Sequence, residues 1–329
     1  MILIRILNYK QLFIKNKNHS CTLNTIIYLV LAVTILGNNS AIPAFGRNPT
    51  SQVLQTQEDL FLIDCGEGTQ SQLAKYKIRR SRISHIFISH MHGDHYFGLI
   101  GLLTSMSLLS RTQDLHLHAP PLLKEILDLQ LSAASTTLTY KVHFHPLGEE
   151  GEIANTNKIS VECFKVKHRI ECWGFLFREI KKPRSIDAER VRSYEIPAAY
   201  YEQLQKGKDY VTKKGTIIPN EELTTAAPKP RSYAYCADTI YDESLAEKLR
   251  EVDLMYHEAT YLKDQHARAA ERFHSTTIQA AAIAKKACVS KLLIGHFSSK
   301  YEVLDDFLSE AKEVFEHTEL AMEGLCFKI

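Results

Sequence analysis

The chain has 329 residues, of which 45% are hydrophobic and 24% charged, a balance typical of a globular protein with a sizeable core. The formal net charge of +2 does not by itself indicate a nucleic-acid-binding protein. Seven cysteines without a CxxC pair argue against a disulfide framework and against a cysteine nucleophile, so we expect reduced thiols and a cytoplasmic location.

The N-terminal segment differs from the rest of the chain. Residues 1–33 carry four basic residues and no acidic one, which leaves a net charge of −2 for residues 34–329. An apolar run at 23–36 imitates a signal peptide or short anchor, but polar residues interrupt it and no small-residue cleavage site follows. We therefore interpret 1–30 as an N-terminal extension whose presence would follow from the choice of translation start site. No membrane association is expected, and a targeting segment is the alternative.

From residue 31 onward, apolar runs typical of strands alternate with helical patterns. The expected strands are 31–36, 53–54, 60–64, 83–89, 115–118, 141–144, 158–166, 174–178, 233–236, 253–257 and 291–294. The expected helices are 70–76, 99–109, 122–132, 276–287 and 303–315. Several of these strands end in His, Asp or Glu, and ligands gather at the C-terminal ends of strands in layered α/β folds. The pattern therefore predicts an α/β fold with a polar site at a sheet edge.

One segment, 181–215, interrupts this alternation. It holds nine Lys and Arg residues against five Asp and Glu residues, and it also contains four tyrosines. A long insertion of this kind inside a compact domain is usually functional. The alternative is a solvated charged loop.

The densest chemical signal follows the strand expected at 83–89. Residues 89–95 read Ser-His-Met-His-Gly-Asp-His, so four candidate metal ligands fall within six residues. Zinc favours imidazole nitrogen and carboxylate oxygen as ligands. His90 and His92 can face one ion, whereas Asp94 and His95 on the following turn can face a second. The spacing therefore predicts a metal centre.

This HxHxDH pattern resembles the signature of the metallo-β-lactamase superfamily. The resemblance implies a four-layer αβ/βα sandwich with a dinuclear zinc centre at one edge. It also implies that His168, Asp238 and His296 complete the ligand set and that Asp238 bridges two zinc ions. The implied ligands of the first ion are His90, His92, His168 and Asp238. Those of the second are Asp94, His95, Asp238 and His296.

Other polar residues have competing interpretations. Asp64 resembles the early aspartate of the superfamily, which orients ligands; the alternative is a helix N-cap. The HxH pairs His116/His118 and His143/His145 have no neighbouring carboxylate cluster, and we interpret them, with His85, as ordinary strand residues.

Four short motifs resemble the ribonuclease Z family. Residues 257–260 read His-Glu-Ala-Thr, and 274–276 read His-Ser-Thr at the start of an alanine-rich helix. Residues 296–301 read His-Phe-Ser-Ser-Lys-Tyr, where the family has arginine before the tyrosine. Residues 43–48 resemble the family's PxKxRN loop, with Phe45 in place of lysine. This departure leaves the handling of a CCA end open.

The ribonuclease Z resemblance covers 31–329 and implies a catalytic domain with a flexible tRNA-binding arm inserted at about 181–215. It further implies a homodimeric, zinc-dependent endoribonuclease that cuts precursor tRNA after the discriminator nucleotide. Asp94 would act as general base. As a hypothesis from the motifs, His274 protonates the departing O3′ and Glu258 orients or charges His274.

Three other functions compete with this one. A small-molecule phosphodiesterase of the same superfamily would not need the basic arm. A non-catalytic RNA-binding protein would have lost at least one of the seven ligands. The interpretation as a membrane-tethered or exported hydrolase depends on residues 1–36 alone.

Overall fold

The structure, a computed structural model, describes residues 31–329, so the extension predicted at 1–30 lies outside the described residues. The described chain forms two compact units. The larger one, here called the body, comprises 31–154, Val161–Phe177 and Ser232–Ile329. The smaller one, here called the inserted unit, comprises Asn155–Ser160 and Arg178–Arg231.

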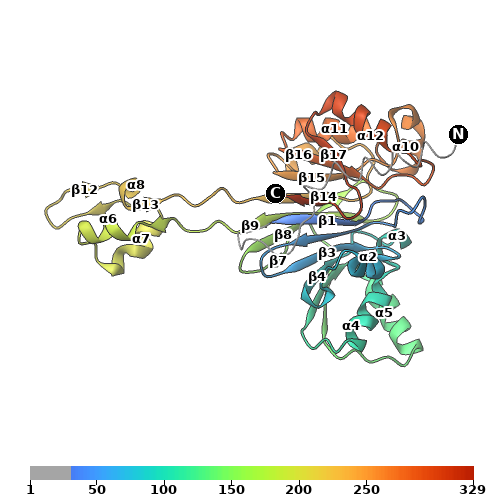
Figure 1. The fold of residues 1–329 in the computed structure, drawn as a ribbon, viewed down its shortest axis with the longest axis horizontal. Coiled ribbons are helices and arrows are strands. Elements are labelled where there is room, and N and C mark those ends of the chain that lie inside the picture. Colours follow the sequence, from blue (N-terminus) through green and yellow to red (C-terminus); the bar gives the residue numbers. More distant parts are fainter. Residues whose placement is uncertain (1–30) are drawn as a thin grey trace, which may run out of the picture. The chain divides into compact units, whose positions relative to one another are not determined.

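Seven strands form the first sheet of the body, in the order β18-β1-β2-β3-β4-β5-β6 (Figure 1). They are β1 (Ala32–Gly37), β2 (Ser51–Gln55), β3 (Leu60–Cys65), β4 (Ile83–Phe87), β5 (Leu115–Ala119), β6 (Val142–Pro146) and β18 (Cys326–Lys328). Strands β3 to β6 pair in parallel, whereas β18, β1, β2 and β3 pair antiparallel. The parallel half follows from the helical crossovers that join its strands.

These crossovers supply the helices of the first outer layer, together with a short 3-10 turn, η1 (Arg80–Arg82). They are α2 (Thr69–Lys75), α3 (Gly93–Tyr96), α4 (Leu99–Leu108) and α5 (Leu122–Ala133). Alternate strand residues such as Leu62, Ile86 and Leu117 share one buried cluster with Leu102 and Leu103 of α4. The period of two in the strands thus buries one face of the sheet under helices.

The second sheet also has seven strands, in the order β17-β16-β15-β14-β9-β8-β7. They are β7 (Gly151–Asn155), β8 (Ile159–Val166), β9 (Cys172–Glu179), β14 (Ser232–Cys236), β15 (Leu254–Glu258), β16 (Lys291–Gly295) and β17 (Thr318–Leu320). The other elements here are α9 (Leu245–Lys248), η3 (Lys263–Gln265), α10 (His266–Arg272), α11 (Thr277–Lys286) and α12 (Asp305–Val314). A capping box between Thr276 and Gln279 starts α11, which packs on β15 and β16.

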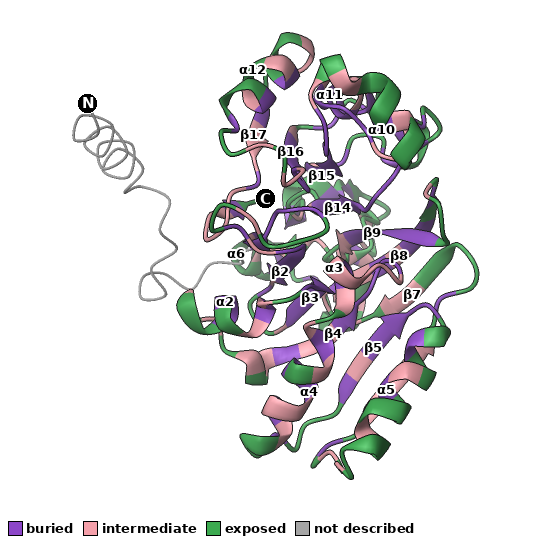
Figure 2. Cartoon of the chain, turned by 90° about the vertical axis from the view of Figure 1, so that its right-hand side faces the viewer, coloured by how far each residue is buried: buried purple, intermediate pink, exposed green. Residues whose placement is uncertain are grey.

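The two sheets pack face to face through aromatic side chains. The Phe87 ring of β4 lies 5.4 Å from the ring centroids of both Phe175 and Phe177 on β9. Figure 2 shows these buried strands between helices whose outer faces are exposed. The predicted four-layer αβ/βα sandwich is therefore confirmed.

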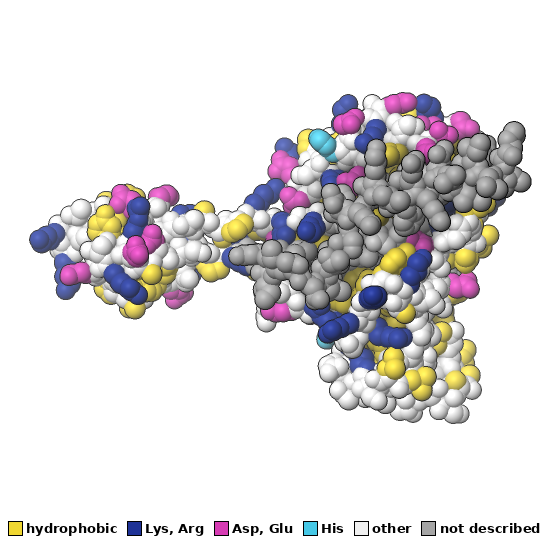
Figure 3. Space-filling model, in the orientation of Figure 1, with side chains coloured by type: hydrophobic (Ala, Val, Ile, Leu, Met, Phe, Trp, Pro, Cys, Tyr) yellow, Lys and Arg dark blue, Asp and Glu magenta, His cyan; other side chains and the backbone are white. Residues whose placement is uncertain are grey.

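The inserted unit has a small core of its own, formed by Val191, Ile196, Leu204, Ile218 and Leu223. Its strands are β10 (Ser185–Ile186), β11 (Tyr210–Val211), β12 (Ile217–Ile218) and β13 (Thr224–Thr225). Its helices are α6 (Ala188–Ser193), η2 (Ala198–Tyr200), α7 (Tyr201–Gln205) and α8 (Asn220–Leu223). The basic segment 181–215 lies within this unit, whose surface carries basic and acidic side chains (Figure 3).

Within residues 31–329, none of the helices combines the length and apolar character that a membrane crossing would require.

Candidate metal centre

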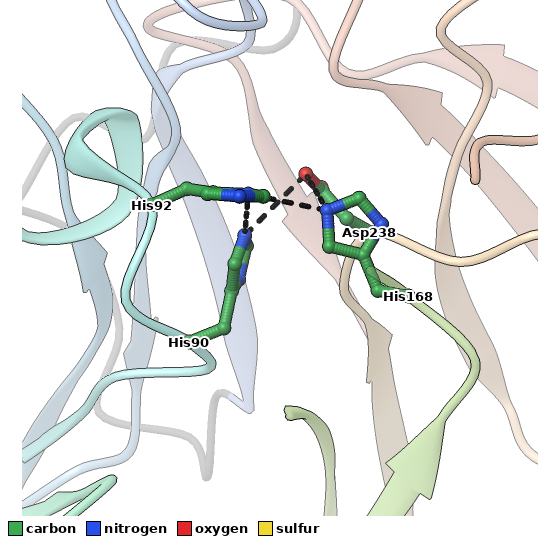
Figure 4. A group of neighbouring side chains, drawn as sticks. All are labelled: His90, His92, His168 and Asp238. Carbon is green, nitrogen blue, oxygen red and sulfur yellow. Dashed lines mark hydrogen bonds and ion pairs between the residues drawn. The ribbon is translucent and has the colours of Figure 1, made fainter. Parts of the chain in front are cut away.

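The first group of site residues comes from both sheets (Figure 4). His90 and His92 lie on the turn between β4 and α3, His168 follows β8, and Asp238 follows β14. The Nδ1 atom of His92 lies 3.0 Å from His90 Nε2 and 3.1 Å from His168 Nε2. Asp238 Oδ2 lies 3.6 Å from His90 Nε2 and 3.9 Å from His168 Nε2. The structure thus brings four of the predicted ligands together.

A second group shares Asp238 with the first. Asp94 and His95 come from α3, and His296 follows β16. His95 Nε2 lies 3.6 Å from Asp94 Oδ2 and 3.5 Å from Asp238 Oδ2. His296 Nε2 lies 3.4 Å from Asp94 Oδ2 and 3.2 Å from Asp238 Oδ1. Asp238 therefore stands between the two groups, with Oδ2 near His90, His168 and His95 and Oδ1 near His296.

The hydrogen bonds around the histidines fix which ring nitrogen faces the centre. In four of the histidines, Nδ1 lies within hydrogen-bonding distance of an acceptor oxygen. The four contacts are His90 to Ser89 Oγ (3.0 Å), His95 to Asp64 Oδ2 (2.7 Å), His168 to the Phe273 carbonyl (2.8 Å) and His296 to Thr260 Oγ1 (2.9 Å). Ser89 and Thr260 each donate their own hydroxyl proton to a carboxylate, so their oxygens accept from the imidazole. Each of the four histidines therefore presents the lone pair of Nε2 to the centre.

Asp64 is the main support behind this arrangement. Its buried carboxylate accepts hydrogen bonds from the Ser89 backbone and hydroxyl, from His95 and from the Tyr235 hydroxyl, at 2.6–2.9 Å. Its backbone lies in the left-handed region with a φ of 54°, as does that of His296 with 61°. Such conformations cost about 1–3 kcal/mol in non-glycine residues and cluster at functional sites.

The chemistry of these donors fits divalent metal ions. Ligand atoms bound at about 2.0–2.1 Å to one tetrahedral zinc ion lie about 3.3 Å apart, close to the separations in both groups. Three buried atoms of the second group, His95 Nε2, His296 Nε2 and Asp238 Oδ1, have no hydrogen-bond partner among the described residues. Because buried polar atoms are normally paired, these three fit a bound cation.

The charges of the centre favour the same conclusion. Burial alone would lower the pKa of His95, but the carboxylates of Asp238, Asp94 and Asp64 raise it well above the usual value. Burial would raise the pKa of Asp238, yet His296, His95 and His90 hold it far below its usual range. The carboxylates therefore create a strongly negative potential that attracts positive charge.

Glu258 and His274 form a pair at the edge of this centre. Glu258, at the end of β15, is fully buried and accepts hydrogen bonds from His274 Nδ1 (3.0 Å), from the Thr260 hydroxyl (2.8 Å) and from three backbone N–H groups. Burial lowers the pKa of His274, but the Glu258 carboxylate outweighs this effect and raises the pKa to about 9. His274 therefore holds a proton at neutral pH, with Nε2 as its second ring nitrogen.

A cavity of about 290 Å³ opens over the metal centre. Its lining includes His92, Asp94, Asp238, His274 and His296. Sequence reasoning missed four further lining residues, Ser40, Ala41, Phe97 and Arg169. Among the described residues of the lining, Arg169 alone is basic apart from the histidines, and its Nη2 atom lies 3.4 Å from His92 Nε2. For two of them the sequence held a signal, since Arg169 directly follows His168 and Phe97 lies two residues after His95.

The remaining histidine pairs lie elsewhere. His85, His116, His118, His143 and His145 stack across β4, β5 and β6, with neighbouring ring centroids 4.5–5.6 Å apart. The structure does not bring them to the metal centre, which agrees with their interpretation as strand residues.

Comparison with known proteins gives close relatives over almost the whole chain. Ribonuclease Z of Bacteroides thetaiotaomicron is 44% identical over 297 residues, which cover 90% of this chain and 94% of the relative. Ribonuclease Z of Porphyromonas gingivalis strain W83 is 41% identical, covering 89% of this chain and 97% of the relative. A family model described as anti-Pycsar protein Apyc1 matches residues 31–189.

Solved structures show the same fold. The short form of human tRNase Z superposes with a TM-score of 0.66 and 25% identity, covering 90% of this chain and 98% of that one. The metallo-β-lactamase fold protein YhfI of Bacillus subtilis superposes with a TM-score of 0.65 and 19% identity, covering 91% and 100%.

Proposed function

The chain belongs to the ribonuclease Z family, and on that premise we propose that it is an endoribonuclease that removes the 3′ trailer from precursor tRNA. The cut falls after the discriminator nucleotide and leaves a 3′-hydroxyl on the tRNA and a 5′-phosphate on the trailer. The observation that carries this proposal is the pair of ligand groups joined by Asp238, with imidazole lone pairs directed inward.

Two zinc ions are the proposed cofactors, because the donor set consists of imidazole nitrogen and carboxylate oxygen. His90, His92, His168 and Asp238 would hold one ion. Asp94, His95, Asp238 and His296 would hold the other. When bound, such ions neutralise phosphate charge and make water a nucleophile near neutral pH.

Asp94 is the proposed general base. Its Oδ2 atom faces both His95 and His296 and accepts a hydrogen bond from the Ala41 backbone N–H at 2.7 Å. Burial would raise the pKa of Asp94, but His95 and His296 hold it below its usual value. Because Asp94 also lines the cavity, its ionised carboxylate can orient the attacking water and accept its proton.

His274 is the proposed acid for the leaving O3′. It lines the cavity, it is protonated at neutral pH, and its Nδ1–H is engaged by Glu258. Its Nε2–H can therefore donate to an oxygen that develops negative charge. Glu258 is fully buried and acts through His274, so its role is that of a positioning residue.

The inserted unit is the proposed binding site for the body of the tRNA. Its basic residues can contact phosphates, and its tyrosines can stack on exposed bases. The proposal also includes a homodimer, inferred from the family, and a cytoplasmic location, inferred from a cysteine pattern that lacks a CxxC pair. The small-molecule phosphodiesterase is not favoured, since the matched relatives are ribonucleases.

The test is cleavage of a precursor tRNA with a short trailer by the wild-type protein and by Asp94→Ala, with and without a chelator. We expect one cut in the zinc-loaded wild type and none in the other three reactions. Retained cleavage of bis-p-nitrophenyl phosphate without any cleavage of the precursor would favour the phosphodiesterase instead.

A further inference from the structure

A basic surface lies on the body, at the C-terminal end of α2 and the turn that leads into β4. Residues 75–82 contain five Lys and Arg residues and no acidic one. We define the basic surface as Lys75, Lys77, Arg79 and Arg80. Figure 3 shows dark blue side chains gathered over this region of the body. Lys77, Arg79 and Arg80 also line a second cavity, of about 480 Å³.

Three of the four charges of this surface are not neutralised locally. Within residues 31–329, none of Lys77, Arg79 and Arg80 forms an ion pair or a side-chain hydrogen bond. Lys75 contacts the ring of Tyr76 at 5.0 Å and also interacts electrostatically with the Glu323 carboxylate. Unpaired cations in a body of slightly acidic composition are suited to a partner with regularly spaced negative charges.

Helix α2 connects this surface directly to the metal centre. A Cβ atom on Gly66, just before α2, would meet the Asp94 carbonyl oxygen at 2.4 Å, and one on Gly98 would meet the Gly66 carbonyl oxygen at 2.2 Å. The start of α2 is thus packed against α3 and the residues that follow it. With seven residues, α2 is about 10 Å long, so the basic surface begins roughly one helix length from Asp94.

Phe97 lies at the beginning of this path. Its side chain is 63% exposed although it lines the cavity over the metal centre. Its ring covers Gly93, where a Cβ atom would come within 2.1 Å of it. An exposed aromatic ring at a phosphodiester site can stack on an unpaired base.

The proposed reaction gives the two sides of the cavity different roles. The departing O3′ belongs to the tRNA, so the tRNA side of the scissile phosphate faces His274, which belongs to the second-sheet half of the body. The trailer is then directed toward the first-sheet half of the body, whose Ala41, Gly93 and Phe97 also line the cavity.

We infer that Phe97 and the basic surface form a track for the single-stranded 3′ trailer, an inference that rests on the proposed function. Phe97 stacks on the first trailer base, and Lys77, Arg79 and Arg80 contact phosphates further along the strand. The track contributes to substrate binding and leaves the chemical step unchanged.

The test uses the full-length zinc-loaded protein and the variant Lys77→Asn/Arg79→Gln/Arg80→Gln. Two precursors of the same tRNA carry a trailer of one nucleotide or a trailer of about ten nucleotides, a length within the range that single-strand sites cover. The control variant Lys285→Gln/Lys312→Gln/Lys328→Gln removes the same charge from exposed positions on α11, α12 and β18.

We expect the basic-surface variant to raise KM for the long trailer roughly tenfold, with KM for the short trailer and kcat for both unchanged. The slope of log affinity against log salt should become shallower by about 2 for the long trailer, as expected for three lost phosphate contacts on a single strand. An equal rise in KM for both precursors, or no rise for either, would overturn the trailer track. Failure of the wild-type protein to cut either precursor would instead overturn the proposed function.

Discussion

Replacing Glu258 with glutamine tests the origin of the acid that we assign to His274. The change keeps the size of the side chain but removes the charge that raises the pKa of His274 to about 9. Without it, burial still lowers the pKa of His274 while Asp238 and Asp94 still raise it, so the pKa moves back toward the ordinary value of about 6.5. A full return to that value would lower the protonated fraction of His274 at pH 7.5 from about 97% to about 9%, roughly a tenfold loss.

The sign of the pH effect follows from these values. A raised pKa keeps the acid form present up to about pH 9 in the wild type, so single-turnover cleavage should decline only above that pH. In Glu258→Gln the same decline should begin at a lower pH, displaced toward 6.5. The NH2 group of the glutamine cannot accept a hydrogen bond, yet it would replace an oxygen that faces donors such as the Ser275 backbone N–H. We therefore expect the free energy of unfolding to fall by about 1–3 kcal/mol for each acceptor lost.

The assay is single-turnover cleavage of precursor tRNA between pH 5.5 and 10, with zinc content measured in parallel. His274→Ala is the matched control, because it should abolish the decline altogether while zinc stays bound. A Glu258→Gln profile that still declines near pH 9 would show that Glu258 does not raise the pKa of His274, and loss of zinc would show that Glu258 supports the metal centre instead.

Three other predictions concern Asp64, the bound metal and the inserted unit. Asp64→Ala should weaken zinc binding about 10- to 100-fold, because His95 loses the acceptor that orients its ring. The affinity would be measured by calorimetry, and an unchanged value would contradict this prediction. Chelation of the metal should lower the melting temperature, since Asp238 and its neighbours would stay buried without the cation; equal melting curves with and without chelator would argue against a bound metal. Neutralising Lys206, Lys208, Lys213 and Lys214 in the inserted unit should raise KM for precursor tRNA and leave turnover of bis-p-nitrophenyl phosphate unchanged; a parallel loss of small-substrate turnover would place the unit in the active site.

The sequence predicted the central elements of the fold better than its edges. The long apolar runs at 60–64, 83–89 and 291–294 correspond to β3, β4 and β16, because buried parallel strands are almost continuously apolar. Strands β7, β17 and β18 were missed, because they are edge strands of three to five residues with mixed polar composition. Their pairing depends on tertiary contacts that no local pattern encodes.

The candidate site shows the same difference between residues that a local sequence pattern reveals and residues that only the fold brings together. His90, His92, Asp94 and His95 are close in sequence, so their spacing alone indicated a metal centre. His168, Asp238 and His296 are separated by long segments and meet only because β8, β14 and β16 end at the same edge, so the family resemblance was needed to select them. Thr260 and Phe273 could not be predicted, since their role is to hold one ring nitrogen each through contacts made by the fold.

The surroundings of Arg47 and Phe45 show which positions of the 43–48 loop are structurally constrained. Arg47 is buried and donates to the Asn39 side chain and to the carbonyl oxygens of Tyr301 and Glu302. Phe45, in the position of the family's lysine, is exposed. The loop thus keeps its buried arginine, whereas the position that differs from the family motif is exposed.

The most direct test of the central claim is to map the ends of the products to the nucleotide. Zinc-loaded protein is incubated with a precursor tRNA labelled at either end, and the termini are identified by their response to phosphatase and to a 3′-end ligase. We expect a single cut after the discriminator nucleotide, with a 3′-hydroxyl on the tRNA and a 5′-phosphate on the trailer. A 3′-phosphate on the tRNA, or cuts spread along the trailer, would contradict it.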